Sequence, residues 1–175
     1  MRVHFAARVV VGLSISSWAS AFGCAASKVI ALNPEDGAPF PRPLDVVART
    51  TGAEDPLPVK GERLVFTNIA PALGHFVSAS LQGWAERHRT QRPGGWELLI
   101  EVTRASAVHD HGTFSVDLDA DFTLSGEVGR VYLAQTTGHC REAVPAPADD
   151  PARVIYACMQ RIGHDLAGWI EGVNP

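Results

Sequence analysis

The chain has 175 residues, of which 46% are hydrophobic and 19% are charged, and its formal net charge at pH 7 is −4. This length accommodates one globular domain with additional terminal segments, and the hydrophobic content excludes a chain that is disordered throughout. The negative net charge argues against nucleic acid or anionic lipid head groups as the main partner.

The first 23 residues have the three parts of a secretory signal peptide. Residues 1–8 are basic, residues 9–22 are mostly apolar, and small side chains follow. The apolar run is shorter than the roughly 20 residues that a transmembrane helix needs. We therefore predict that residues 1–23 are an export signal that is removed.

Two cleavage sites are compatible with this signal. Residues 19–21 (Ala-Ser-Ala) fit the small-x-small rule and would leave Phe22 as the new N-terminus. Residues 21–24 (Ala-Phe-Gly-Cys) resemble a bacterial lipobox, in which Cys24 is acylated and becomes the first residue. The second alternative makes the protein a lipoprotein.

The number of cysteines favours lipidation of Cys24. The chain has three cysteines, and an exported protein with an odd number has one thiol to account for. If Cys24 carries lipid, Cys140 and Cys158 can pair in an oxidising compartment. The alternatives are an unpaired Cys24 in a leader segment and two buried free thiols at Cys140 and Cys158.

Residues 24–61 are predicted to be a lipidated, Pro-rich tether. No helical or strand period persists there, and proline removes backbone donors and biases the preceding residue to extended conformations. A short edge strand at residues 44–47 is the one element that the pattern allows in this segment. The interrupting prolines are Pro34, Pro39, Pro41, Pro43, Pro56 and Pro58.

The clearest strand pattern of the chain lies at residues 112–125. Phe114, Val116 and the next apolar residues alternate with polar or acidic ones, so one face is apolar and the other is acidic and solvated. Such alternation is typical of an antiparallel sheet that is covered on one side only.

The remaining pattern of residues 62–175 predicts an α+β globular domain of the order β-α-β-β-β-α. Two amphipathic helices should cover one face of an antiparallel-rich sheet and form a two-layer sandwich. Pro71 suits the first turn of the first helix, and Asp149 or Asp150 should cap the last one. The other predicted strands are residues 63–66, 96–108 and 130–137, with turns at 109–112 and 127–129 and a loop at 140–150.

This arrangement predicts a disulfide between Cys140 and Cys158. Cys140 ends the predicted fourth strand, and Cys158 lies on the apolar stripe of the last helix. The bridge would close a loop of roughly 18 residues and stabilise the fold by about 3 kcal/mol in the chain-entropy model.

Two groups of residues resemble metal ligands, and we predict no metal or other cofactor at either. Asp117, Asp119 and Asp121 lack the glycine and glutamate of a calcium loop, and a straight strand separates alternate carboxylates by about 7 Å. His109 and His111 lie in a predicted turn, where His139 or His164 could complete a zinc site. A solvated face and an exposed turn are the simpler interpretations.

No motif of an enzyme is present in the sequence. A nucleophile elbow, a phosphate-binding glycine loop and a zinc-protease helix are all missing. His139 and Cys140 are adjacent, but neighbours on a strand point to opposite faces and cannot form a catalytic pair. We therefore predict no catalytic residues.

The leader, the Pro-rich segment and the β-α-β-β-β-α domain together resemble small accessory lipoproteins of Gram-negative envelope transport systems. These families include the ABC-type transport auxiliary lipoproteins and the LPS-assembly lipoprotein with its relatives. The similarity covers about two thirds of the chain. It follows the helix at residues 71–89, the turn at 94–96, the alternating strand and the segment at 129–130.

The resemblance implies a tethered domain that docks onto other envelope proteins and has no catalytic residues. We therefore expect a non-enzymatic accessory lipoprotein of a bacterial envelope transport or assembly complex. Its lipid anchor at Cys24 would hold it on the periplasmic face of the outer or inner membrane. The alternative is a soluble periplasmic or secreted protein that binds a metal or another ligand.

Overall fold

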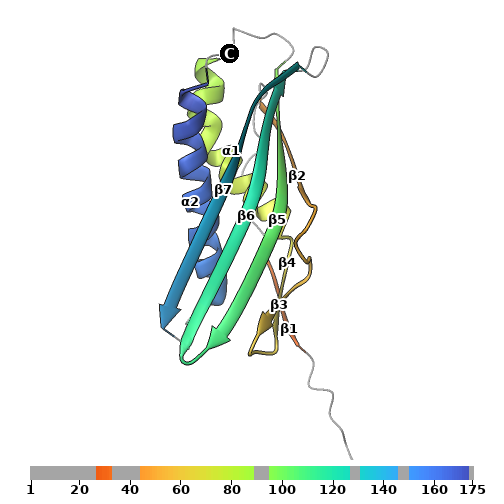
Figure 1. The fold of residues 1–175 in the computed structure, drawn as a ribbon, viewed down its shortest axis with the longest axis vertical. Helices are drawn as coiled ribbons and strands as arrows, with labels where there is room; N and C mark the ends of the chain where they lie inside the picture. Colours follow the sequence, from red (N-terminus) through yellow and green to blue (C-terminus); the bar gives the residue numbers. More distant parts are fainter. Residues whose placement is uncertain (1–26, 33–43, 89–94, 127–130, 146–149, 174–175) are drawn as a thin grey trace, which may run out of the picture.

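The computed structural model describes residues 27–32, 44–88, 95–126, 131–145 and 150–173. Within them, seven strands form one mixed sheet, and two helices lie on the same face of it (Figure 1). The predicted α+β two-layer sandwich is therefore confirmed. The elements are β1 (Lys28–Ala31), β2 (Leu44–Thr50), β3 (Leu57–Lys60), β4 (Leu64–Thr67), α1 (Ile69–Arg87), β5 (Trp96–Asp110), β6 (Thr113–Gly126), β7 (Val131–Pro145) and α2 (Pro151–Glu171).

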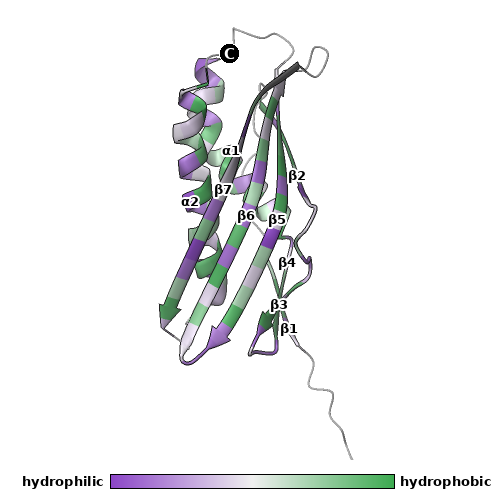
Figure 2. Cartoon of the chain, in the orientation of Figure 1, coloured by the Kyte–Doolittle hydropathy of each residue, from purple (hydrophilic) through white to green (hydrophobic). Residues whose placement is uncertain are grey.

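The longest strands of the sheet, β5, β6 and β7, form an antiparallel meander. Every second residue of β6 from Phe114 to Gly126 is buried, as the alternating sequence predicts. The same alternation is visible as bands of apolar and polar residues along β6 in Figure 2. The buried side faces the helices: α2 packs against β6 and β7, and α1 packs against α2, β2 and β5.

The turn between β5 and β6 is shorter than predicted. The strands continue to Asp110 and resume at Thr113, so only His111 and Gly112 form the turn. Both residues have positive φ, 46° and 74°. Two-residue hairpin loops of type I′ need this conformation at both central positions, and it matches the twist of the flanking strands. The prediction of a four-residue turn at 109–112 was wrong for this reason.

Strand β7 is also longer than predicted. It continues to Pro145 and pairs with β6 along its whole length, from Gly126↔Val131 to Thr113↔Pro145. Cys140 therefore lies inside the strand. The prediction of a loop from residue 140 was wrong for residues 140–145, which belong to β7. Pairing with the long β6 supplies hydrogen-bond partners to a segment whose own sequence has no clear alternation. Pro145 is tolerated because it stands at the end of an edge strand.

The segment predicted as a tether contributes three strands to the sheet. β1 pairs in parallel with β4, β2 pairs in parallel with β5, and β3 pairs with both β4 and β5. The possible edge strand at residues 44–47 is the first half of β2. Short strands next to prolines carry little periodic signal, because their stability comes from partners that are distant in the chain. The folded part of the chain thus begins before residue 62.

The helices agree with their predicted positions to within about two residues. α1 begins at Ile69 and buries a stripe that includes Leu73, Val77 and Leu81. α2 is capped by Asp150, whose carboxylate accepts a hydrogen bond from the backbone N–H of Ala152 at 3.1 Å. None of the helices in the described part of the chain is long and apolar enough to cross a membrane.

Helix α2 is held against the sheet by a covalent bond and by a close approach. Cys140 of β7 and Cys158 of α2 form a disulfide with a Cα–Cα distance of 5.5 Å. Two residues earlier on β7, a Cβ atom on Gly138 would lie 2.8 Å from Phe122 Cε2 and 3.0 Å from Ile162 Cγ2. Glycine at this position therefore lets α2 pack directly on the sheet.

Replacement of Gly138 by valine should reduce the stability of the fold. The new side chain must displace Phe122 and Ile162, and overpacking of this kind costs about 1 to 3 kcal/mol of unfolding free energy. Urea denaturation measures the change. The control is Gly168→Ala, because an added Cβ in this part of α2 meets no atom within 4 Å. The control should be at least as stable as the wild type, since alanine favours helix more than glycine does. Equal stability of Gly138→Val and wild type would contradict the proposed packing.

Candidate functional site on the exposed face of the sheet

Cys24, the predicted site of lipidation, lies outside the described residues. The structure does describe the other candidate residues. His109 lies near the end of β5 and His111 lies in the β5–β6 turn, and each is paired with a carboxylate of its own. His109 Nδ1 lies 2.5 Å from Glu62 Oε1, and His111 Nδ1 lies 2.7 Å from Asp110 Oδ1.

The additional histidines suggested for the turn lie elsewhere. His164 is an exposed residue of α2. His139 of β7 is opposite Asp119 of β6, whereas His109 of β5 is opposite Phe114 of β6. The two positions are five residues apart along β6. At about 3.4 Å per residue this separation is roughly 17 Å. The structure therefore does not gather these histidines at the turn.

The acidic face of β6 receives side chains from both neighbouring strands. Asp117 lies opposite Arg141, and Asp119 lies opposite His139 on one side and Arg104 on the other. Because directly opposed residues of an antiparallel pair point to the same face, all five side chains meet on the exposed side of the sheet. We call Asp117, Asp119, His139, Arg104 and Arg141 the polar cluster.

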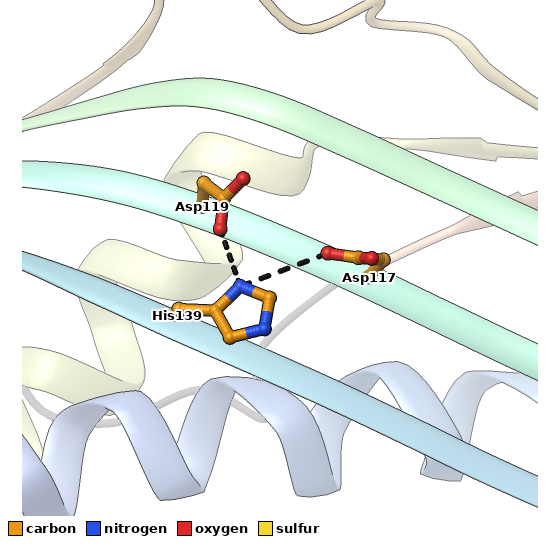
Figure 3. A group of neighbouring side chains, drawn as sticks. All are labelled: Asp117, Asp119 and His139. Atoms are coloured by element: carbon orange, nitrogen blue, oxygen red, sulfur yellow. Dashed lines mark hydrogen bonds and ion pairs between the residues drawn. The ribbon is translucent and has the colours of Figure 1, made fainter.

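His139 lies between the two aspartates (Figure 3). Its Nδ1 atom donates a hydrogen bond to Asp119 Oδ1 at 2.5 Å and lies 3.7 Å from Asp117 Oδ1. Each of the three residues offers one atom that could bind a metal ion, and these three atoms lie within 4.8 Å of one another. Two carboxylates and an imidazole are ligands that a divalent transition metal accepts.

The two arginines offset the charge of the aspartates. Arg104 Nη2 lies 3.8 Å from Asp117 Oδ2, and Arg104 Nη1 lies 3.8 Å from Asp119 Oδ2. Arg141 Nε lies 4.0 Å from Asp117 Oδ2. These contacts are ion pairs at longer range than a hydrogen bond. A metal ion would have to compete with both guanidinium groups for the carboxylates.

Asp117 is the least satisfied member of the polar cluster. Its side chain is only 14% exposed, and its Oδ1 atom is buried without a hydrogen-bond partner among the described residues. Buried polar oxygens of this kind are uncommon in native proteins. The nearest cationic side chain to this oxygen is His139, whose Nδ1 lies 3.7 Å away, so a ligand reaches Oδ1 only after a side chain of the polar cluster moves aside.

A β-bulge brings Arg104 to the polar cluster. The register of β5 against β6 shifts between Val102 and Arg104, so Thr103 is the extra residue. In a regular strand Arg104 would point to the same side as the buried Val102. The bulge reverses this side and directs Arg104 towards Asp119. Arg104 could not be predicted as a member of the polar cluster, because a bulge in a regular apolar pattern cannot be recognised without the partner strand.

Gly52 is a residue in the sequence whose identity is explained by this bulge. After β2, the backbone N–H groups of Thr51 and Gly52 donate to the carbonyl oxygen of Val102 at 3.0 Å and 3.4 Å. A Cβ on Gly52 would lie 2.4 Å from the carbonyl oxygen of Thr103. Only glycine allows the chain to pass this close to the irregular part of β5.

The disulfide also bears on the chemistry that this face can perform. His139 is exposed on the outer face, whereas Cys140 is buried on the inner face and bonded to Cys158. Cys140 therefore has no free thiol that His139 could activate.

No protein-family model matches the chain, and no curated protein matches it. Among solved structures, protein XCC0632 from Xanthomonas campestris, of the family DUF330, is similar with a TM-score of 0.49 and 14% identity, over 81% of this chain and 94% of that chain. Hypothetical protein CT253 from Chlamydia trachomatis has a TM-score of 0.46 and 12% identity, over 85% and 98% of the two chains. Lipoprotein GNA1162 from Neisseria meningitidis has a TM-score of 0.38 and 11% identity, over 73% and 99%.

None of these three proteins is named as an ABC-type transport auxiliary lipoprotein or an LPS-assembly lipoprotein. That resemblance of the sequence therefore stays a prediction.

Replacement of Asp117 by asparagine should destabilise the fold at low ionic strength. The variant keeps the positive charges of Arg104 and Arg141 but has only one carboxylate, that of Asp119, to balance them. We expect a decrease of roughly 0.5 to 1 kcal/mol in unfolding free energy at low salt and a smaller decrease at high salt. The control is Asp121→Asn on the same face of β6, because the residues opposite Asp121 are Glu101 and Thr137 and neither is basic. A loss for Asp117→Asn that is independent of salt would contradict an electrostatic role of Asp117.

Proposed function

We propose that this protein is a non-enzymatic accessory lipoprotein of a bacterial envelope transport or assembly complex. Acylation of Cys24 would anchor it in the outer or inner membrane on the periplasmic side. The folded part of the chain would then act as a protein-interaction domain that the anchor keeps near its partners.

The observation that carries this proposal is the division of the three cysteines into a pair and a single residue. Cys140 and Cys158 form the disulfide between β7 and α2. The remaining Cys24 directly follows the apolar part of the leader, at the position that a lipobox requires. A disulfide is typical of an oxidising compartment outside the cytoplasm, so the pair and the leader support the same location.

The protein-interaction part of the proposal is supported by the edge of the sheet. β7 is the last strand in the sheet order β1-β4-β3-β5-β6-β7 and is 15 residues long. Only one side of it pairs with β6, and no described strand pairs with the other side. The backbone groups of such an edge can accept an added strand from a partner.

Acylation can be measured on the intact protein purified from membranes. We expect a mass that starts at Cys24 with a diacylglyceryl or triacyl modification, and no alkylatable thiol before reduction, since Cys140 and Cys158 are bonded. The variant Cys24→Ala should leave the membrane fraction, whereas the variant Cys140→Ala/Cys158→Ala should stay in it. A chain that starts at Phe22 with one free thiol would contradict the proposal and indicate a soluble exported protein.

Metal binding by the polar cluster is a second candidate function. The observation in its favour is that ligand atoms of Asp117, Asp119 and His139 lie within 4.8 Å of one another. Imidazole nitrogen and carboxylate oxygen together suit Zn²⁺, Cu²⁺ or Ni²⁺.

Calorimetric titration with Zn²⁺ tests this second function. If the polar cluster binds zinc, the wild type should release or take up heat, and both Asp117→Asn and His139→Ala should abolish the signal. The control His111→Ala should not change it, since His111 is paired with Asp110 at the distant turn. A titration of the wild type without heat and without a shift in melting temperature would exclude this function.

A further inference from the structure

Three parts of the chain meet at one end of the sheet, at the bottom of Figure 1. The backbone N–H of Lys28, at the start of β1, donates to the carbonyl oxygen of Arg63 at 2.8 Å. Arg63 follows the turn between β3 and β4, and Glu62 of this turn contacts His109 at the end of β5. We call the start of β1, the β3–β4 turn and the β5–β6 turn together the hairpin end of the domain.

The hairpin end carries an excess of positive charge. Lys28, Lys60 and Arg63 are exposed, and the described residues offer none of them a carboxylate at ion-pair distance. Among the described residues of these three segments the carboxylates are Glu62 and Asp110, and each is paired with a histidine. The nearby start of α2 adds one acidic residue, Asp150, and one basic residue, Arg153. The chain as a whole has a net charge of −4, so this end differs in sign from the average surface.

The distance from the proposed anchor to this end is short. Cys24 precedes Lys28 by four residues, and a fully extended chain of this length spans at most about 14 Å. A lipid on Cys24 would therefore hold Lys28 and the neighbouring basic residues close to the headgroups. Electrostatic attraction to anionic lipids acts over about 8 Å at physiological ionic strength, so these residues are placed where it is effective.

The opposite end of the domain is far from the anchor. Arg87 and Glu171, the last residues of α1 and α2, form an ion pair there. α2 has 21 residues, and at 1.5 Å per residue it extends for about 31 Å away from its start near the hairpin end.

We propose that the hairpin end docks on anionic phospholipid headgroups of the same bilayer that holds the lipid of Cys24. The docking rests on the acylation proposed above and adds an orientation to it. The long strands stand upright on the membrane, the ends of α1 and α2 point away from it, and the free edge of β7 is presented sideways to partners.

The orientation can be measured with the full-length acylated protein in vesicles. A fluorophore is attached to a new cysteine at the hairpin end (Thr113→Cys) or at the distant end (Glu86→Cys), both at exposed positions. A nitroxide on the lipid headgroup quenches a fluorophore that lies near the bilayer surface. His111→Cys is a second probe of the hairpin end in case Thr113→Cys folds poorly. Mass spectrometry verifies that the native disulfide is intact in each variant.

In vesicles of phosphatidylglycerol and phosphatidylcholine, the probe at the hairpin end should be quenched severalfold more than the probe at Glu86. This difference should decrease in phosphatidylcholine alone, at high salt, and in the variant Lys28→Gln/Lys60→Gln/Arg63→Gln. The matched control is Arg49→Gln/Arg87→Gln/Arg161→Gln, which removes as many positive charges from exposed positions of β2, α1 and α2 away from the hairpin end and should retain the difference.

Equal quenching of both probes would overturn the docking, as would a difference that depends neither on anionic lipid nor on the three basic residues. Either result on protein with acylated Cys24 would leave the proposed function intact. Absence of acyl mass on Cys24 would instead contradict the proposed function itself.

Discussion

The one-sided burial of the β5–β6–β7 meander is the constraint on which the rest of the structure depends. β6 pairs with both neighbours along its length, so its register places every apolar residue under the helices and every acidic residue outside. A shift by one residue would reverse both faces. The disulfide and the glycine at position 138 add to this constraint, because they hold α2 against the buried side. The covered face and the exposed face thus follow from the same pairing.

The exposed face shows how this register produces a possible ligand site. Cross-strand neighbours bring two arginines and a histidine to the aspartates of β6, and the bulge in β5 is needed for Arg104 to take part. The charges largely compensate one another, which explains how an acidic strand is tolerated between two neighbouring strands. Asp117 remains the exception, since one of its oxygens is buried without a hydrogen bond. This feature distinguishes the polar cluster from an ordinary solvated face.

In the proposed anchoring through Cys24, the N-terminal strands connect the fold to the membrane. Because β1 is part of the sheet, the folded domain begins four residues after Cys24. A long flexible tether would allow the domain any orientation, whereas a short connection to one end of a sheet restricts it. Its pairing with β4 places β1 at the sheet edge opposite β7. A protein anchored in this way can offer the free side of β7 to a partner while the hairpin end faces the lipid.

The sequence by itself determined the elements whose signals are local. Alternation in β6, the apolar stripes of α1 and α2 and the cap at Asp150 could be recognised, because each depends on neighbours in the chain. The pairing of Cys140 with Cys158 followed from the places of the two cysteines on the predicted elements. Only the tertiary structure decided the strands β1 to β3, the extension of β7 to Pro145 and the convergence of Arg104, Asp117 and His139. These features depend on hydrogen bonds and ion pairs between segments far apart in the sequence, and a single strand carries no record of which partner it will meet.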